Sequence, residues 1–141
     1  MKVPFKNSLT YKMEARIESL PFNVILRADL SDLADKRQVS YAIKQLINQK
    51  KIVRLGYGLY AKTEPSPYSD TLLLKEPNGF AGTIREALNR LNIPWQQSEA
   101  EEEYNSGRST QVPVRSILRL KVRFRRKIAF AGKEFKYQKV S

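Results

Sequence analysis

Neither cysteine nor histidine occurs among the 141 residues of this chain. Without cysteine the chain has no disulfides and no thiolate metal sites, and without histidine it lacks the usual nitrogen ligand of zinc. The two absences also exclude Cys–His dyads and Ser–His–Asp triads. They weigh against an enzyme, and we expect no catalytic residue, no metal and no cofactor.

Long apolar runs are missing as well. No segment approaches the roughly 20 consecutive apolar residues that a membrane-spanning helix needs. The N-terminal sequence MKVPFKNSLTYK has no apolar stretch of the kind that a secretory signal peptide carries. We therefore expect a cytoplasmic protein with no membrane partner, of a length that fits one domain or two small ones.

Basic residues are abundant and unevenly distributed. The net charge of +12 and the pI of about 10.0 favour a polyanionic partner. Residues 1–62 carry 12 Lys and Arg against 5 Asp and Glu, residues 63–110 carry 4 against 8, and residues 111–141 carry 10 against 1. The positive surplus therefore lies toward the two ends of the chain, with an acidic middle.

The first third of the chain has three helical segments. Apolar residues at helical spacing predict a helix over residues 8–20, and a short extended piece at 23–27 precedes a short helix at 28–33. Residues 35–50 form the third helix, with Asp35 as its cap. Its apolar stripe consists of Val39, Ala42, Ile43, Leu46 and Ile47.

A hairpin is expected directly after this third helix. Gly56-Tyr57-Gly58 separates two β-prone runs at residues 52–55 and 59–62. Glycine adopts positive φ readily, so the pattern predicts a tight turn. Three helices followed by a hairpin is the order of a winged helix-turn-helix, which we predict for residues 5–62.

The rest of the chain predicts a smaller α+β unit. Prolines and turn formers at residues 63–70 indicate a linker, and residues 80–91 have helical spacing. From residue 111 onward the apolar residues recur at every second position, which predicts antiparallel strands. These strands are expected at residues 112–124, 127–130 and 134–137, with a turn at Gly132-Lys133. We therefore predict an α+β fold, with the winged helix-turn-helix joined to a C-terminal domain at residues 71–141.

The outer face of the helix at residues 35–50 is the first candidate site. A recognition helix reads the major groove with its N-terminal residues, where Arg addresses guanine and Gln or Asn addresses adenine. We expect base reading by Lys36, Arg37, Gln38, Ser40, Tyr41 and Lys44. On the hairpin, Arg54 and Tyr57 are expected to contact phosphate or the minor groove. The alternatives for this face are a solvated surface and a protein-interaction module.

Residues 118–126 read LRLKVRFRR, in which apolar and cationic side chains alternate. As a strand, this segment has one apolar face and one cationic face. Successive cations on that face are about 6.6 Å apart, which is comparable to the distance between successive phosphates of a nucleic-acid strand. We expect contact with the DNA backbone from Arg119, Lys121, Arg123 and Arg125. The alternatives are docking to an acidic protein and an edge strand kept soluble by its charges.

Two acidic features allow other chemistry. Glu134-Phe135-Lys136 matches the E-x-K unit of some Mg²⁺-dependent nucleases, but the only Asp in the second half is Asp70, in the expected linker. The acidic cluster at residues 99–103 is interpreted as a solvated helix or loop, since consecutive carboxylates point in different directions.

Several short motifs together resemble one bacterial family. They are Leu46, residues 50–55 with the sequence KKIVRL, residues 58–61 with the sequence GLYA, residues 104–107 with the sequence YNSG, and residues 110–113 with the sequence TQVP. They are similar to the AbiEi-type antitoxins and transcriptional regulators of type IV abortive-infection toxin–antitoxin systems. The resemblance covers roughly residues 8–137, and is carried by the stretch at residues 19–62 above all.

The resemblance implies a winged helix that binds double-stranded DNA at its own promoter and represses it. It also implies a C-terminal domain that contributes to antitoxin action, and a nucleotidyltransferase-like toxin from a neighbouring gene. The chain is shorter than many such antitoxins, which leaves a solitary regulator open.

The sequence thus predicts a sequence-specific DNA-binding repressor that acts as an antitoxin. One alternative is an adaptor whose basic strand docks an acidic partner, and another is a small nuclease that uses Glu134 and Lys136. The repressor hypothesis requires the cations of both ends of the chain to converge on one surface. The operator sequence and the oligomeric state are left open.

Overall fold

The structure is a computed structural model and describes residues 8–97, 106–107 and 117–140. It confirms an α+β fold in which, over the described ranges, three α-helices combine with mainly antiparallel sheets. The elements are α1 (Leu9–Ser19), β1 (Val24–Leu26), the 3₁₀ turn η2 (Arg27–Asp29), α2 (Lys36–Asn48), β2 (Ile52–Gly56), β3 (Leu59–Pro65), β4 (Leu72–Leu74), α3 (Gly79–Arg90), β5 (Trp95–Gln96), β6 (Leu118–Leu120), β7 (Ala129–Phe130), β8 (Lys133–Glu134) and β9 (Tyr137–Lys139). None of these helices is long and apolar enough to cross a bilayer.

The two N-terminal helices begin where the sequence predicts. The Ser8 hydroxyl accepts a hydrogen bond from the Tyr11 amide at 3.1 Å, and the Asp35 carboxylate accepts one from the Gln38 amide at 2.8 Å. Such caps satisfy backbone donors that have no partner within the helix. Between the helices, the helix expected at 28–33 is wrong: only the single turn η2 forms, and the Asp29 carboxylate binds the Leu26 amide across it.

A four-stranded antiparallel sheet follows these helices, with β1, β3 and β2 side by side in that order and β4 paired to the end of β3. The predicted β2–β3 hairpin is confirmed, and Gly58 in its turn has a φ of 65°. β3 continues to Pro65 and pairs with β4, so the first three residues of the expected linker are strand instead.

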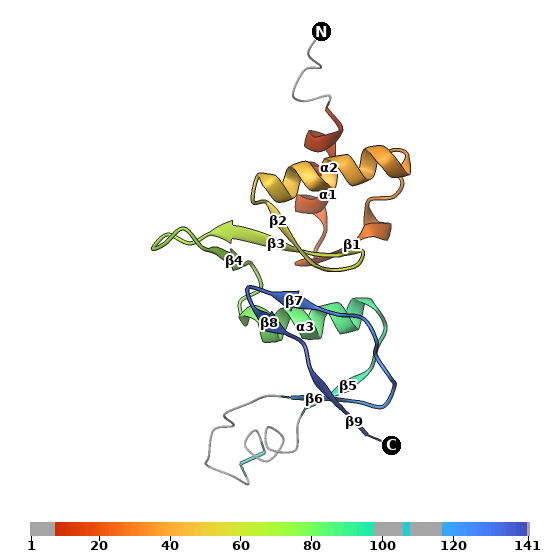
Figure 1. Ribbon diagram of the computed structural model, residues 1–141, viewed down its shortest axis with the longest axis vertical. Coiled ribbons are helices and arrows are strands. Elements are labelled where there is room, and N and C mark those ends of the chain that lie inside the picture. The colour runs from red at the N-terminus through yellow and green to blue at the C-terminus, as the bar shows by residue number, and fades with distance from the viewer. Residues whose placement is uncertain (1–7, 98–105, 108–116, 141) are drawn as a thin grey trace.

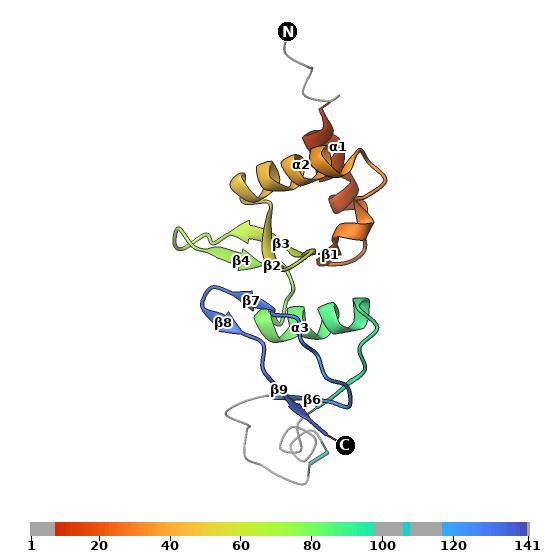
Figure 2. The ribbon, with the colours of Figure 1, turned by 45° about the vertical axis from the view of Figure 1, so that its right-hand side comes forward.

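Both faces of this sheet are covered, because successive side chains of a strand point to opposite faces. One face carries Ile25, Ile52 and Tyr60 and packs against α1 and α2. The other face carries Val24, Leu55, Leu59 and Ala61 and packs against α3 and residues that follow it in the chain. The result is a stack of layers along the long axis of the molecule, with the sheet shared between the two expected domains (Figures 1 and 2).

Polar contacts fix α3 against the edge of this sheet. The Glu86 carboxylate accepts hydrogen bonds from the backbone amides of Asn23 and Val24, at 3.0 and 2.9 Å. One turn later, Arg90 pairs with Asp29, and its guanidinium lies 4.1 Å from the centre of the Phe22 ring. These contacts determine how α3 is oriented relative to the first third of the chain.

The pKa of Asp29 reflects this environment. Burial acts to raise the pKa, but hydrogen bonds from Arg90 and from the Leu26 amide outweigh burial and hold the pKa below its usual value. Asp29 therefore stays ionised and keeps its ion pair with Arg90 at neutral pH.

The C-terminal strands differ from the prediction. Residues 112–116 of the expected strand at 112–124 lie outside the described residues, and strand structure is found only in β6, which pairs antiparallel with β5 and parallel with β9. β7 and β8 form a short antiparallel hairpin, with its turn at Ala131-Gly132. The expected strand at 134–137 is divided between the end of β8 and the start of β9.

Beyond Leu120 the chain is irregular, and at Phe124 a side chain takes the backbone hydrogen bonds that a neighbouring strand would otherwise make. The Tyr137 hydroxyl accepts a hydrogen bond from the Phe124 amide at 2.8 Å and donates one to the Phe124 carbonyl at 3.1 Å. The Phe124 ring also packs edge-on against Phe135 and Tyr137. The segment at residues 121–128 therefore leaves the sheet and rises toward the β2–β3 hairpin (Figure 1).

This rising segment passes directly over Gly56 and leads to a first prediction. A Cβ on Gly56 would overlap the backbone carbonyl of Lys127, which cannot move without displacing the buried Ile128. Gly56→Ala is expected to lower the free energy of unfolding by about 1–3 kcal/mol, as overpacking does elsewhere. Urea denaturation measures this loss.

Gly82→Ala is the matched control. The three atoms nearest to a Cβ on Gly82 all belong to the Glu76 carboxylate, which is the end of a flexible side chain, and alanine is the better helix former by about 1 kcal/mol. The two opposing effects should leave stability nearly unchanged. Equal losses in both variants would mean that the 121–128 segment does not press on β2.

Candidate nucleic-acid interface

A groove of about 850 Å³ runs between α2 and the β2–β3 hairpin. We call it the α2 groove. Its floor contains Ile43, Ile47 and Tyr60. The cationic residues that line it are Arg27, Lys36, Arg37, Lys44 and Arg54. No Asp or Glu is among the described residues that line it, so the groove is suited to a polyanion.

The helix α2 supplies one wall of the groove. Its buried stripe faces the sheet, as predicted, which leaves Lys36, Ser40 and Lys44 one and two turns apart on an exposed face. Lys36 is the first residue of the helix, where the ends of backbone amides add positive potential. The most positive end of α2 therefore opens into the groove.

The β2–β3 hairpin supplies the opposite wall. Tyr57 stands at its turn with 83% of its surface exposed, so its ring projects from the protein. The Arg54 side chain lies along the strand, where its Nε donates to the Gly56 carbonyl at 3.2 Å. The structure thus brings Arg54 and Tyr57 to the same groove as the cations of α2.

Two arginines that the sequence analysis missed hold this arrangement together. Arg27 of η2 donates to the Lys36 carbonyl and to the Ser40 hydroxyl, each at 2.9 Å. Arg126 donates to the Tyr57 carbonyl at 2.6 Å. A Cβ on Gly58 would lie 3.8 Å from the Arg27 Cβ and 3.9 Å from the Arg126 Nη2, so the two arginines flank the hairpin turn.

The remaining expected residues of α2 are divided between two sides of the helix. Gln38 and Tyr41 line a different hollow, of about 560 Å³, which α2 forms with the start of α1. Arg37 lines both this hollow and the α2 groove. The six residues expected to read bases are all exposed, but they do not form one row.

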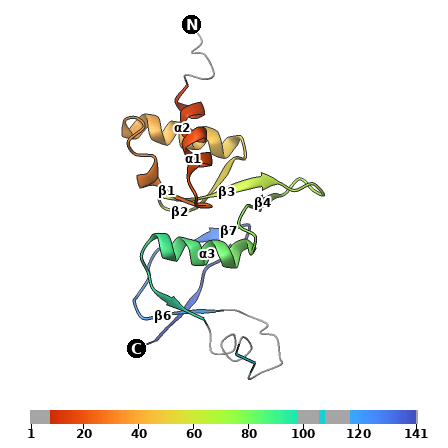
Figure 3. The ribbon, with the colours of Figure 1, turned by 180° about the vertical axis from the view of Figure 1, so that it is seen from behind.

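The expected row of cations on a C-terminal strand is wrong. Arg119 is only half exposed, and its Nε donates to the Gln97 carbonyl at 2.6 Å. Its strand β6 lies at the end of the molecule farthest from α2 in every view (Figures 1, 2 and 3). Lys121, Arg123 and Arg125 are exposed on irregular chain. The expected convergence of both basic ends on one surface is therefore wrong for the described residues. There the C-terminal segment meets the hairpin at Gly56, over which the Lys127 carbonyl lies, and through the Arg126 hydrogen bond, and its exposed cations do not join the α2 groove.

A metal-dependent site finds no support in the part of the chain that the structure describes. No group of three or more His, Cys, Asp or Glu side chains there is placed to hold a metal ion. Glu134 is exposed on β8 beside Lys133, away from the α2 groove. The acidic cluster at 99–103, Tyr104, Asn105 and the motif at 110–113 lie outside the described residues.

Comparison of the chain with family models, with curated proteins and with solved structures finds no match. The binding partner of the protein is therefore inferred from the geometry and the charge of the α2 groove.

Proposed function

We propose that this protein binds double-stranded DNA in a sequence-specific manner and represses its own promoter as an antitoxin-type regulator. The observation that carries the proposal is a groove lined by five cations and no carboxylate beside a capped, exposed helix. The order α1, β1, η2, α2 and β2–β3 hairpin supports a winged helix-turn-helix, in which α2 would be the recognition helix.

The dimensions of α2 suit this role. A helix with its side chains is about 10–12 Å across and fits the major groove of B-DNA, which is about 12 Å wide. With α2 inserted, Lys36, Arg37 and Lys44 reach base edges or flanking phosphates. The hairpin, with Arg54 and Tyr57, then lies against the neighbouring backbone or minor groove.

Arg27 and Arg126 have a supporting role in this proposal. The Arg27 amide donates to the Gly58 carbonyl of the hairpin turn, and its side chain donates to the start of α2. Arg126 connects the same turn to the C-terminal segment through the Tyr57 carbonyl. They keep the two walls of the α2 groove at a fixed separation, which reduces the conformational entropy that DNA binding costs. Repression then requires no bond chemistry, only occupancy of the promoter.

The antitoxin part of the proposal rests on the family resemblance of the motifs around Leu46 and Gly58. It implies a nucleotidyltransferase-like toxin encoded beside this gene. An adaptor function is the second candidate, and the observation that favours it is that Lys121, Arg123 and Arg125 are exposed outside the α2 groove.

Salt dependence tests DNA binding directly. With about five phosphate contacts, the affinity for a duplex from upstream of the gene should fall roughly 500-fold between about 50 and 200 mM salt. Fluorescence anisotropy measures this slope, and a duplex of scrambled sequence is the control. A flat salt response would contradict DNA binding, and equal affinity for both duplexes would contradict sequence specificity.

A further inference from the structure

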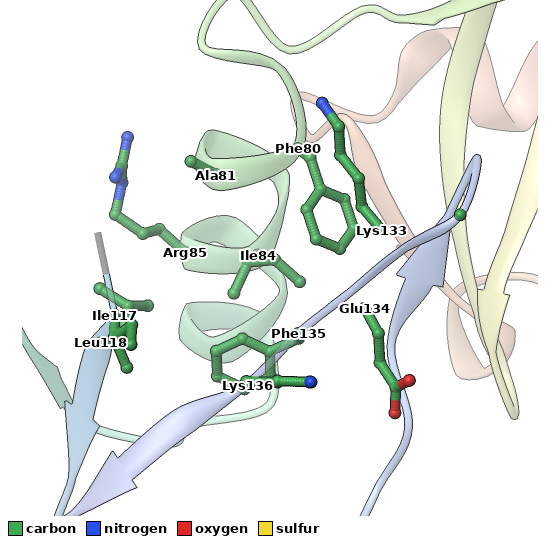
Figure 4. Close-up of a pocket in the computed structure, with 11 residues that line it drawn as sticks. Phe80, Ala81, Ile84, Arg85, Ile117, Leu118, Lys133, Glu134, Phe135 and Lys136 are labelled. Carbon is green, nitrogen blue, oxygen red and sulfur yellow. The ribbon is translucent and has the colours of Figure 1, made fainter. Parts of the chain in front are cut away.

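A second groove, of about 570 Å³, lies on the other side of the β1-β3-β2 sheet, between α3, the start of β6 and residues 132–136 around β8 (Figure 4). We call it the α3 groove. Its apolar lining includes Phe80, Ile84, Ile117 and Phe135, and Ile117 keeps 39% of its surface exposed. An open apolar groove of this kind is typical of a binding surface.

Cations surround this apolar lining. Arg85 stands on one side of the groove and Lys133 on the other, with Phe80, Ile84 and Phe135 between them (Figure 4). Lys136 adds a third positive charge, and Glu134 is the only acidic residue among the described residues that line the groove. The groove therefore favours a ligand that is apolar at its centre and negative at its edges.

A peptide meets this requirement better than a nucleic acid does. Bases bind proteins by stacking on open aromatic faces. Here Phe135 already stacks on Tyr137, with centroids 5.8 Å apart and planes at 26°, and it also meets the edge of Phe124. Phe80 is half-buried against the core. A phosphate backbone would pair with the cations but would leave the apolar lining uncovered.

We propose that the α3 groove docks a peptide segment of a partner protein in which apolar anchor residues stand next to Asp or Glu. The anchors fill the space over Ile84 and Ile117, and the carboxylates pair with Arg85, Lys133 and Lys136. The α2 groove and the α3 groove lie on opposite sides of the β1-β3-β2 sheet. The protein can therefore hold DNA and an acidic partner at the same time.

Two synthetic peptides of about 12 residues test this proposal, each with Leu at helical spacing on one face. One carries Glu at all other positions and the other carries Lys. The acidic peptide is expected to bind the full chain with a dissociation constant below about 100 μM, and the basic peptide at least about tenfold more weakly. Fluorescence polarisation measures both affinities.

Reversal of the surrounding charge gives the sharpest result. Arg85→Glu/Lys136→Glu should exchange the preference, so that the basic peptide binds more tightly. Lys12→Glu/Lys75→Glu, on exposed positions outside the α3 groove, is the matched control and should keep the preference of the unmodified protein. Ile117→Glu should weaken binding of the acidic peptide, while affinity for duplex DNA stays unchanged.

Several results would overturn the proposal. One is absence of acidic-peptide binding up to about 1 mM, which is at least tenfold weaker than the dissociation constant expected above. Another is an unchanged preference in the Arg85→Glu/Lys136→Glu variant. A third is tighter binding of oligothymidylate than of the acidic peptide, lost in Ile117→Glu. A fourth is a dimer in sedimentation that Ile117→Glu converts to a monomer, which would make the groove a contact between two copies.

Discussion

Arg37→Glu/Lys44→Glu is expected to lower the affinity for the upstream duplex by about 100-fold or more. Each lost contact with a base or phosphate costs about 1–3 kcal/mol, and the new carboxylates repel the DNA backbone. Both side chains are exposed, so the fold should be retained and the melting temperature nearly unchanged. Anisotropy titration at fixed salt gives the affinity, and a thermal melt gives the stability.

Lys75→Glu/Lys139→Glu is the matched control for total charge. Both pairs change the net charge of +12 to +8, because each of two cations becomes an anion. Lys75 and Lys139 are exposed but do not line the α2 groove, so the control should weaken binding by less than about fivefold, through the long-range field alone. Equal losses in the two variants would mean that net charge, and not the groove, binds DNA.

Arg90→Ala is expected to cost the largest share of stability of any single polar substitution considered for this protein. The change removes the ion pair with Asp29, a 3.3 Å hydrogen bond to the Val24 carbonyl and the stacking on Phe22. Loss of one partner of a buried ion pair typically costs 3–5 kcal/mol. We expect about 3 kcal/mol, because the Arg90 and Asp29 side chains keep 16% and 15% of their surface exposed.

Arg85→Ala, on the same helix, is the control and should change the free energy of unfolding by less than about 0.5 kcal/mol. Acid denaturation gives a second measurement. Because the pKa of Asp29 is lowered, the stability that it contributes is complete above about pH 4 and is lost as the pH falls through the lowered pKa. Without Arg90 the pKa of Asp29 is no longer held as low, so this acid-dependent part of the stability should shrink in Arg90→Ala. A variant as stable as the unmodified protein would contradict the importance of this ion pair.

The parts of the fold that local sequence determines were predicted well. The apolar stripe of α2 and its Asp35 cap lie within one segment, and so do the glycines of the β2–β3 turn. The sequence also carried a sign that both faces of the sheet would be covered. Leu59, Tyr60 and Ala61 are three consecutive buried residues, which is the pattern of a strand covered on both faces.

The C-terminal segment could not be predicted because distant contacts determine it. Alternation at residues 118–124 is typical of a strand, but the Tyr137 hydroxyl takes the backbone groups of Phe124 out of any sheet. The parallel pairing of β6 with β9 joins residues that only the folded chain brings together. Contacts of this kind leave no periodic signal in the sequence.

Only part of the candidate site was predicted, because distant contacts bring some of its residues together. Lys36, Arg37, Ser40 and Lys44 follow from the exposed face of one helix. Arg27 lies in a turn and Arg126 falls in the apolar register of its segment, so no pattern indicates that both flank Gly58.

The most direct test of the account is a two-dimensional amide NMR titration of the protein with the upstream duplex. The account predicts that the largest shift changes occur in α2, from Lys36 to Lys44, and at Tyr57 and Gly58 of the hairpin. The amides of β6 and β9, at the far end of the molecule, should change little. Large changes in β6 and β9 with α2 unaffected would contradict the assignment of the α2 groove as the DNA-binding surface.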